Sequence, residues 1–285
     1  MVAGAYNHST KRLAALVVLC AAALAGARAT AAQAPGFHLV WSDEFDHDGP
    51  PDPANWTYER GFVRNQELQW YQPDNARVAN GRLVIEARRE HVANPAFDAS
   101  SADWRRNRAA ADYTSSSLTT RGLHSFLYGR FEMRARIDTR GGLWPAFWTV
   151  GVSGRWPHNG EIDIMEFYRS TLLANVAWGG PAPGKAIWAD TRTPIASFGP
   201  AWSEQFHVWR MDWDAQAIRL YVDDRLLNDV DLARTANQDG SGVNPLRQAQ
   251  AIILNLAVGA TGGDPTATDF PARYDIDYVR VSQRK

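Results

Sequence analysis

Short segments in which charged and apolar residues alternate place the strongest constraint on how this 285-residue chain can fold. Along residues 130–137 every even position is charged and every odd position is apolar. A repeat of two is typical of a β-strand with one buried face, whereas an α-helix repeats every 3.6 residues. Helical periodicity is scarce in the rest of the sequence, so we predict an all-β chain.

Other segments of the sequence also have the pattern of β-strands. Further strands are expected at residues 83–85, 218–222, 251–258 and 274–281. Asp223 and Asp224 follow one of these strands and are typical of a hairpin turn. Many short strands separated by Gly, Pro, Asn and Asp favour an antiparallel sandwich or barrel. The polar stretch from His91 to Tyr113 predicts a long surface loop, which is a candidate border for a binding cleft.

The start of the chain has the three parts of a secretory signal peptide. Lys11 and Arg12 precede an apolar run at residues 13–26, and small-residue cleavage sites follow up to Ala31. This order of basic start, short apolar core and small residues is that of a leader, and the apolar run is short for a membrane span. We therefore expect a leader at residues 1–31 and a secreted mature protein, extracellular or periplasmic, without membrane association.

Cysteine content and charge narrow the classes of function. Cys20 is the only cysteine and lies in the expected leader, so no disulfide supports the mature chain. Loss of Lys11, Arg12 and Arg28 with the leader changes the formal net charge from −1 to −4. Such a chain has no general attraction to phosphate backbones, so nucleic acid is not an expected partner. The mature length suits one domain, which we place at residues 37–285 and expect to be monomeric.

All twelve tryptophans lie in the expected mature part, many of them beside polar residues. Flat aromatic faces with a polar edge suit sugar rings. Large β-sandwiches also bury tryptophan in their cores, so composition alone leaves both interpretations open.

The sharpest local feature is a group of three acids, Glu161, Asp163 and Glu166, interleaved with isoleucine and methionine. Strict alternation places Glu161 and Asp163 on one face of a strand and buries Glu166 on the other. A buried, unpaired carboxylate costs several kcal/mol or becomes neutral. A β-bulge at Ile164 and Met165 removes the conflict, because one extra residue brings all three acids to the same face.

Three acids on one face match the needs of retaining glycoside hydrolysis. One carboxylate attacks the anomeric carbon and a protonated partner donates to the leaving oxygen, with the two groups about 5–5.5 Å apart. Mutual repulsion raises at least one pKa, which suits that group to the role of acid. A structural acid cluster or a metal site remains an alternative at this point.

The segment around these acids resembles the signature of family 16 of the glycoside hydrolases, in the laminarinase-like branch with one extra residue before the last glutamate. Further blocks resemble the same family, in the same order along most of the mature chain. They are residues 41–46, 65–71, 128–132, 142–148, 156–160, 254–259, 262–265 and 277–281. In combination these blocks make the resemblance a specific one.

The resemblance implies a concanavalin A-like β-jelly roll, in which two antiparallel sheets form a sandwich with a concave substrate cleft. It implies that Glu161 is the nucleophile, Asp163 its hydrogen-bonding helper and Glu166 the general acid/base of a double displacement. The substrate would be a β-1,3- or mixed β-1,3/1,4-glucan, cut within the chain. Two departures bear on the substrate: residues 259–265 lack a tryptophan that is often present, and Ala177 stands where many laminarinases have histidine.

Residue type and position within these blocks indicate the candidate sugar-binding residues. They are Asn65, Glu67, Trp144, Trp148, Trp156, Trp178 and Asn255. Trp156 is the favoured sugar platform because it lies directly before the acid segment. Trp144 and Trp148 are four residues apart and share a strand face, either in the core or in the cleft.

No cofactor is expected for the chemistry. The seven histidines lack metal-ligand spacing, and His207, flanked by Phe206 and Trp209, is expected to be a packed structural residue. The resemblance implies a structural calcium ion on the convex side. Its ligands would be Glu44, the carbonyl of Gly81 and Asp277, and oxygen ligands of this kind suit calcium.

Three alternatives keep the fold but change the function. The backbone of the substrate could be a galactan, as in agarases and carrageenases. A sugar acceptor in place of water would make the chain a transglycosylase. A glucan-binding lectin without catalysis is the third alternative, although such proteins usually lose the acids that this chain retains.

Overall fold

A computed structural model describes Met1, Val2 and residues 36–285 of the chain. The leader expected at residues 1–31 therefore falls outside the described residues except for its first two. Residues 36–285 belong to one compact unit, Gln33–Lys285. Within the described residues, no helix has both the length and the apolar character needed to cross a membrane.

The larger of two sheets runs in the order β16-β15-β14-β8-β18-β5-β6-β3, with β1 beside β18 and β4 beside β5. All its pairs are antiparallel except β3 with β6. Its strands are β1 Phe37–Asp43, β3 Gln69–Tyr71, β4 Ala76–Val78, β5 Leu83–Ala93, β6 Ala110–Ser115, β8 Gly129–Arg136, β14 His207–Trp213, β15 Ala217–Val222, β16 Arg225–Asp231 and β18 Ala272–Arg284.

The smaller sheet runs in the order β12-β11-β10-β9-β17-β7-β2, with β13 beside β11. Its strands are β2 Thr57–Tyr58, β7 Ser117–Thr119, β9 Leu143–Gly151, β10 Glu161–Tyr168, β11 Thr171–Gly179, β12 Ala186–Ala189, β13 Arg192–Pro194 and β17 Gln250–Val258. Helices are short: α1 Trp104–Asn107 and the 3₁₀ turns η1 Pro73–Asn75, η2 Ile195–Phe198, η3 Trp202–Glu204, η4 Leu232–Arg234, η5 Pro245–Arg247 and η6 Ala260–Gly262.

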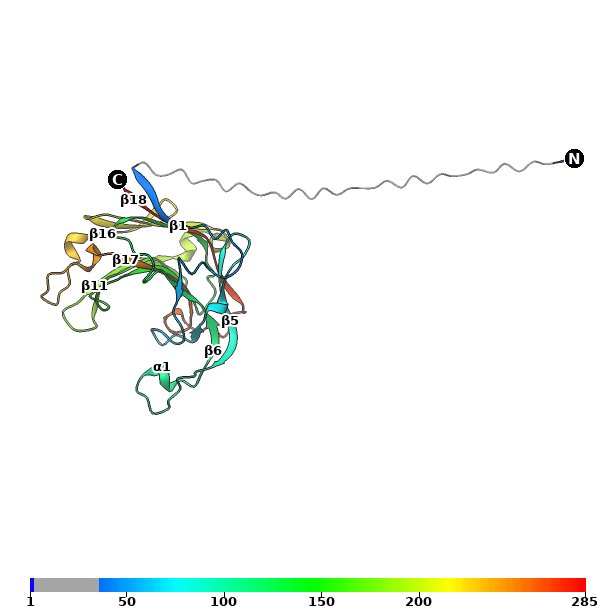
Figure 1. The fold of residues 1–285 in the computed structure, drawn as a ribbon, viewed down its shortest axis with the longest axis horizontal. Coiled ribbons are helices and arrows are strands. Elements are labelled where there is room, and N and C mark those ends of the chain that lie inside the picture. The colour runs from blue at the N-terminus through cyan, green and yellow to red at the C-terminus, as the bar shows by residue number, and fades with distance from the viewer. Residues whose placement is uncertain (3–35) are drawn as a thin grey trace. The chain divides into compact units, whose positions relative to one another are not determined.

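The two sheets lie one above the other, and the smaller one bends so that its hollow side faces away from the larger one (Figure 1). Between them lies one apolar core, to which both sheets contribute. In β8 the buried residues are Phe131, Met133 and Ala135, which are the odd positions predicted from the alternation. The all-β jelly-roll sandwich expected from the sequence is confirmed, with the hairpin at Asp223 and Asp224 joining β15 to β16.

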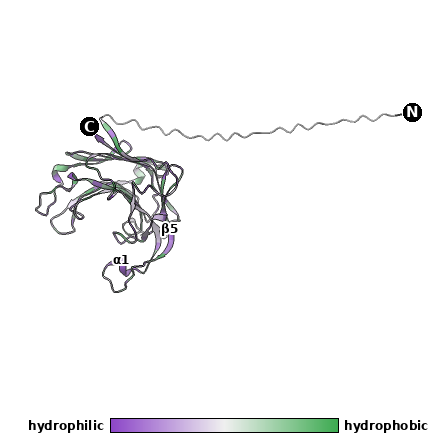
Figure 2. Ribbon diagram, viewed as in Figure 1, coloured by the Kyte–Doolittle hydropathy of each residue, from purple (hydrophilic) through white to green (hydrophobic). Residues whose placement is uncertain are grey.

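The expected loop from His91 to Tyr113 is only partly correct. β5 continues to Ala93 and β6 begins at Ala110, so both ends of the segment belong to strands. The part between them contains α1, which is hydrophilic in Figure 2. The polar residues that suggested a loop alternate with small apolar ones near its ends, and strand pairing between β5 and β6 decides their conformation.

Candidate active site

Strand β10 carries the three acids and contains the predicted bulge. Its register with β9 and with β11 shifts between Asp163 and Glu166, where β10 has one more residue than either neighbour. Ile164 and Met165 are both fully buried in the core. Glu166 returns to the face that holds Glu161 and Asp163, as the side-chain chemistry required.

Cross-strand neighbours define this acid-bearing face of the smaller sheet. In antiparallel sheets, directly opposed residues point to the same side. Asp163 lies opposite Trp148 of β9 and Asn175 of β11, and Glu161 lies opposite Ala177. The face away from the core therefore brings together residues from three strands.

Glu166 is held by two donors. The indole Nε1–H of Trp144 donates to Glu166 Oε1 at 2.9 Å, and Asn175 Nδ2 donates to Oε2 at 3.4 Å. The backbone N–H of Thr191 donates to Asn175 Oδ1, which fixes the orientation of that amide. Burial, together with the negative charge of Glu161, raises the pKa of Glu166 to about 7, against the opposing effect of the two donors. At neutral pH Glu166 can hold or release a proton.

Glu161 and Asp163 divide their protonation unequally. Burial raises the pKa of Glu161, while hydrogen bonds from Asp163 and Trp156 and the charge of Arg64 lower it. Burial and the charges of Glu166 and Glu161 raise the pKa of Asp163 well above its ordinary value. Asp163 is therefore the group that keeps a proton and donates it to Glu161, and Glu161 is the group that ionises.

A second polar group, centred on the buried Glu67, lies beside the acids. Its carboxylate accepts from Gln69 at 2.7 Å, Tyr71 at 3.2 Å and Asn65 at 3.3 Å. Asn255 Nδ2 donates to the Tyr71 hydroxyl at 3.1 Å, and Asn255 Oδ1 accepts from Trp148 Nε1–H at 2.8 Å. The expected residues Asn65, Glu67, Trp148 and Asn255 thus belong to one hydrogen-bonded network.

Arg64 and Asn175 are residues of this site that the sequence analysis missed. The Arg64 guanidinium lies 5.0 Å from the Trp148 ring centre and pairs with Glu59. Arg64 lies one position before residues 65–71, which resemble the family, and only the fold brings its side chain near Glu161. Asn175 could have been found from its strand, since it alternates with the buried residues Ala174 and Val176.

The loop between β5 and β6 borders this network. Arg108 donates to the carbonyls of Glu67 and Gln66, and Arg105 donates to the carbonyl of Val63. Trp104 of α1 packs against Phe62, with ring centres 5.9 Å apart. The loop therefore supports the segment that carries Arg64 and Glu67.

Trp178 does not join the other predicted sugar-binding residues. It belongs to the core cluster and is only 7% exposed. Alternation along β11 explains this position, because Asn175 and Ala177 face the acids and Trp178 faces the opposite sheet. Trp178 is not accessible to stack on a sugar, so the prediction that it is a sugar platform is wrong.

Trp156 is the most exposed of the predicted platforms, at 47%. Its Nε1–H donates to Glu161 Oε2 at 2.5 Å. Trp144 and Trp148 also lie on the acid-bearing face, which decides between the core and cleft alternatives left open by their spacing.

Of the expected calcium ligands, Asp277 lies in β18, whereas Glu44 directly follows β1 and Gly81 lies between β4 and β5. Glu44 accepts two hydrogen bonds from Arg280, at 2.8 and 2.7 Å, and Asp277 accepts one from Arg134 at 2.7 Å. Two carboxylates and the carbonyl of Gly81 have the oxygen chemistry that calcium prefers. Within residues 36–285, no group of three or more His, Cys, Asp or Glu side chains is arranged to hold a metal ion. A calcium ion would compete with the two arginines.

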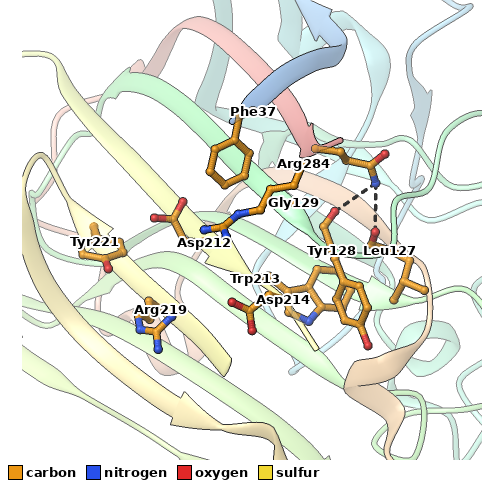
Figure 3. Close-up of a pocket in the computed structure, with 11 residues that line it drawn as sticks. Phe37, Leu127, Tyr128, Gly129, Asp212, Trp213, Asp214, Arg219, Tyr221 and Arg284 are labelled. Atoms are coloured by element: carbon orange, nitrogen blue, oxygen red, sulfur yellow. Dashed lines mark hydrogen bonds between the residues drawn. The ribbon is translucent and has the colours of Figure 1, made fainter. Parts of the chain in front are cut away.

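A cavity of about 420 Å³ lies against the larger sheet, and none of the predicted site residues lines it. Phe37, Asp212, Tyr221 and Arg284 are among its walls (Figure 3). The faces of its two outer aromatic rings are covered by guanidinium groups, from Arg130 and Arg284 on Phe37 and from Arg210 on Tyr221. A sugar that stacked on these covered faces would have to displace a guanidinium group.

A β-sandwich with three neighbouring carboxylates beside indole groups has the side chains that a glycoside hydrolase needs. The sequence supports this class, since the model of glycosyl hydrolases family 16 matches residues 64–280. The chain belongs to that family.

Individual relatives agree with this assignment. The beta-glucanase of Rhodothermus marinus is 38% identical over 87% of this chain and 86% of its own length. The laminarinase catalytic domain of Thermotoga maritima has a TM-score of 0.72 at 35% identity, covering 87% of this chain and 99% of the other. A structure from work on endo-acting O-glycanases, which human gut microbiota express to initiate mucin breakdown, has a TM-score of 0.81 at 36% identity, covering 88% and 92%.

Proposed function

We propose that this enzyme hydrolyses β-1,3- or mixed β-1,3/1,4-glucan within the chain and retains the anomeric configuration. The observation that carries the proposal is the bulge that brings three acids to one face of β10, where their pKa values differ. Glu161 is the group that ionises, Asp163 keeps its proton, and Glu166 titrates at about 7. Such a division supplies a nucleophile and an acid at the same pH.

The reaction would proceed in two displacements. In the first, Glu161 forms a bond to the anomeric carbon while the glycosidic bond breaks, and the proton of Glu166 passes to the leaving oxygen. In the second, Glu166 takes a proton from water, the water oxygen bonds to the anomeric carbon, and Glu161 leaves as a carboxylate. Asp163 donates to Glu161 and so stabilises it whenever it carries charge.

Sugar rings would be held by the groups around the acids. The exposed indole of Trp156 offers an apolar face next to the nucleophile. The network of Glu67, Asn65, Asn255 and Trp148 offers polar edges beside the acids. The choice of a glucan rests on the relatives, among them the Rhodothermus marinus beta-glucanase.

A second candidate substrate is a mucin-type or keratan-type glycan that contains galactose. The TM-score of 0.81 for the O-glycanase structure exceeds the 0.72 of the Thermotoga maritima laminarinase at nearly equal coverage. A keratan-sulfate endo-1,4-beta-galactosidase of Sphingobacterium multivorum is also related, at 28% identity over 89% of this chain. Reducing-end release from laminarin, lichenan, agarose, carrageenan, keratan sulfate and mucin decides between them. Release from none of these would contradict the proposed activity.

The roles of Glu161 and Glu166 can be distinguished with substrates that carry different leaving groups. Glu161→Ala removes the nucleophile and should reduce kcat more than about 10³-fold on every substrate. Glu166→Ala removes the proton donor, so it should impair polysaccharide cleavage strongly but impair a dinitrophenyl glycoside much less, because that leaving group needs no proton. Circular dichroism confirms folding in both variants, and an equal loss on both substrates in Glu166→Ala would argue against its role as acid.

We also propose that the enzyme acts outside the cytoplasm after removal of residues 1–31. The basic start and short apolar run of the leader support this. Intact mass of the protein recovered from culture medium or periplasm should correspond to a chain that begins near residue 32. A full-length chain retained in the cytoplasm would contradict the proposal.

A further inference from the structure

The turn that carries Trp156 runs from Arg155 to Gly160, within the connection of residues 152–160 between β9 and β10. Trp156 is about half exposed, yet its Nε1–H reaches Glu161 Oε2 at 2.5 Å. An exposed side chain has few packing contacts to fix its direction, so the backbone of the turn must set where the indole points. The groups that fix the backbone of this turn therefore determine the direction of the indole.

Asn237 connects the turn to the neighbouring strand. Its Nδ2 donates to the carbonyl of His158 at 2.9 Å, and its Oδ1 accepts from the backbone N–H of Gly179 at 2.7 Å. The side chain is only 7% exposed, so both bonds are shielded from water. The segment that holds Asn237 is itself fixed to β11, because Gln238 N donates to the carbonyl of Gly179 at 2.9 Å.

The turn and β11 fit closely at this point. A Cβ on Gly179 would lie 2.4 Å from His158 Cδ2 and 2.8 Å from Asn237 Oδ1, so only glycine fits. Gly179 is two residues beyond Ala177, which lies opposite Glu161. The amide of Asn237 therefore ties the turn to the strand that also flanks the nucleophile.

The opposite side of the turn has supports of its own. Asn159 Nδ2 donates to the carbonyl of Gly151 at 2.8 Å, and Gln248 Nε2 donates to the carbonyl of Asn159 at 3.0 Å. These contacts fix the turn against β9 and the start of β17. Asn237 supplies the contact toward β11. It lies in a segment to which the proposed catalysis assigns no role.

We propose that Asn237 is a positioning residue for Trp156, whose amide holds the turn against β11 and so aims the indole N–H at the carboxylate of Glu161. The proposal rests on the proposed role of Glu161 as nucleophile. Asn237 touches neither substrate nor reacting atoms. Its effect passes through one backbone carbonyl, two residues from Trp156.

Several charged groups face Glu161, and a test has to leave them unchanged. Asp163 and Glu166 lie on the same strand, and the positive charge of Arg64 acts on Glu161 from the segment before β3. On the turn itself, His158 Nε2 lies 3.5 Å from Asp239 Oδ2. Asn237→Ala adds no charge to this set, so a shift in the titration of Glu161 would report the lost indole contact.

The test compares pH profiles of kcat/KM for wild type, Asn237→Ala, Trp156→Phe and the double variant. Asn237→Ala should lower kcat/KM about tenfold and move the acidic limb to higher pH, because Glu161 loses a donor to its charged form. Trp156→Phe should move the limb in the same direction. If Asn237 acts through Trp156, the double variant should be no worse than Trp156→Phe alone. Full additivity would overturn the proposal.

Asn75→Ala is the matched control. Asn75 is buried, and its Nδ2 also bridges two elements, to the carbonyl of Glu86 at 2.7 Å and to Thr114 Oγ1 at 3.0 Å. It should lower Tm as Asn237→Ala does but leave the acidic limb in place. An acidic limb that stays unmoved in Asn237→Ala, with only a loss of Tm, would show a purely structural role and overturn the proposal.

A second measurement does not depend on activity. The indole ¹H–¹⁵N resonance of Trp156, assigned by its loss in Trp156→Phe, should move toward the position of a free indole in Asn237→Ala. Asn237→Asp keeps the acceptor for Gly179 and loses the donor to His158, so the same indole resonance can be measured in it if the alanine variant does not fold. Its added charge excludes it from the comparison of pH profiles. An unmoved resonance would overturn the positioning role, whereas inactive wild type with a moved resonance would count only against the proposed function.

Discussion

Glu166 lowers the stability of the fold at the pH where it works. Its pKa is about 7 in the folded protein, against about 4.5 in an exposed glutamate. Between these two values the folded state binds more protons than the unfolded state, so the contribution of this group to stability falls as pH rises. Above about pH 7 the ionised Glu166 destabilises the fold by its full amount, and below about pH 4 this destabilisation vanishes.

Glu166→Gln should therefore raise Tm at pH 8 and leave it almost unchanged at pH 4. Each kcal/mol recovered corresponds to about 2–4 °C for a domain of this size. Differential scanning calorimetry at the two pH values measures the difference. Glu204→Gln changes the same chemical group on the exposed surface and should have little effect. An equal or lower Tm at pH 8 would contradict the buried charge.

The indole of Trp144 should tune the alkaline limb of the pH profile. Its donation to Glu166 Oε1 favours the charged form and lowers the pKa. Trp144→Phe removes that donor, so the pKa rises and the limb, near pH 7 in the wild type, moves to higher pH. Trp148→Phe is the control, because its Nε1–H donates to Asn255 instead and should leave the limb in place. A limb that moves down in Trp144→Phe would contradict this assignment.

At the scale of elements, the bulge in β10 gives a prediction about deletion. Removal of Met165 would restore regular alternation, and Glu161, Asp163 and Glu166 would still share one face. We expect this deletion to retain measurable hydrolysis but to lower Tm, since a fully buried side chain is lost.

Met165→Ala keeps the bulge and serves as the comparison. It should cost about 2–5 kcal/mol of stability and leave the pH profile unchanged. A folded deletion variant without any activity would show that hydrolysis needs the bulge itself, and not only three acids on the same face of β10.

The bulge was predictable because burying Glu166 among isoleucines carries a cost that the sequence already reveals. Trp178 was misplaced because its tryptophan side chain suits both a core and a sugar platform, and only the phase of β11 decides. Arg64 was missed because its contact with Trp148 joins residues far apart in the chain. Strands followed from local alternation, whereas the network around Glu67 depends on how β3, β9 and β17 come together.

At the scale of the whole molecule, we propose that calcium stabilises the sandwich without a role in the chemistry. Glu44, Gly81 and Asp277 would supply its oxygen ligands, and the ion would replace Arg280 and Arg134 as the partners of the two carboxylates. Millimolar calcium should then raise Tm, and EDTA should lower it, with kcat unchanged. Magnesium is the control, and identical Tm values in all three conditions would contradict the proposal.

The pairing of β1 with β18 has a consequence for how the enzyme can be shortened. The family match begins at residue 64, but β1 covers one side of β18 from Val279 to Arg284. A chain trimmed to begin at residue 64 but still ending at Lys285 would lose that cover, together with the buried Phe45 and Trp56. Bare backbone N–H and C=O groups along a strand invite pairing with other molecules. The trimmed chain should keep its acids and still precipitate, and its solubility would depend on the first strand rather than on the catalytic face.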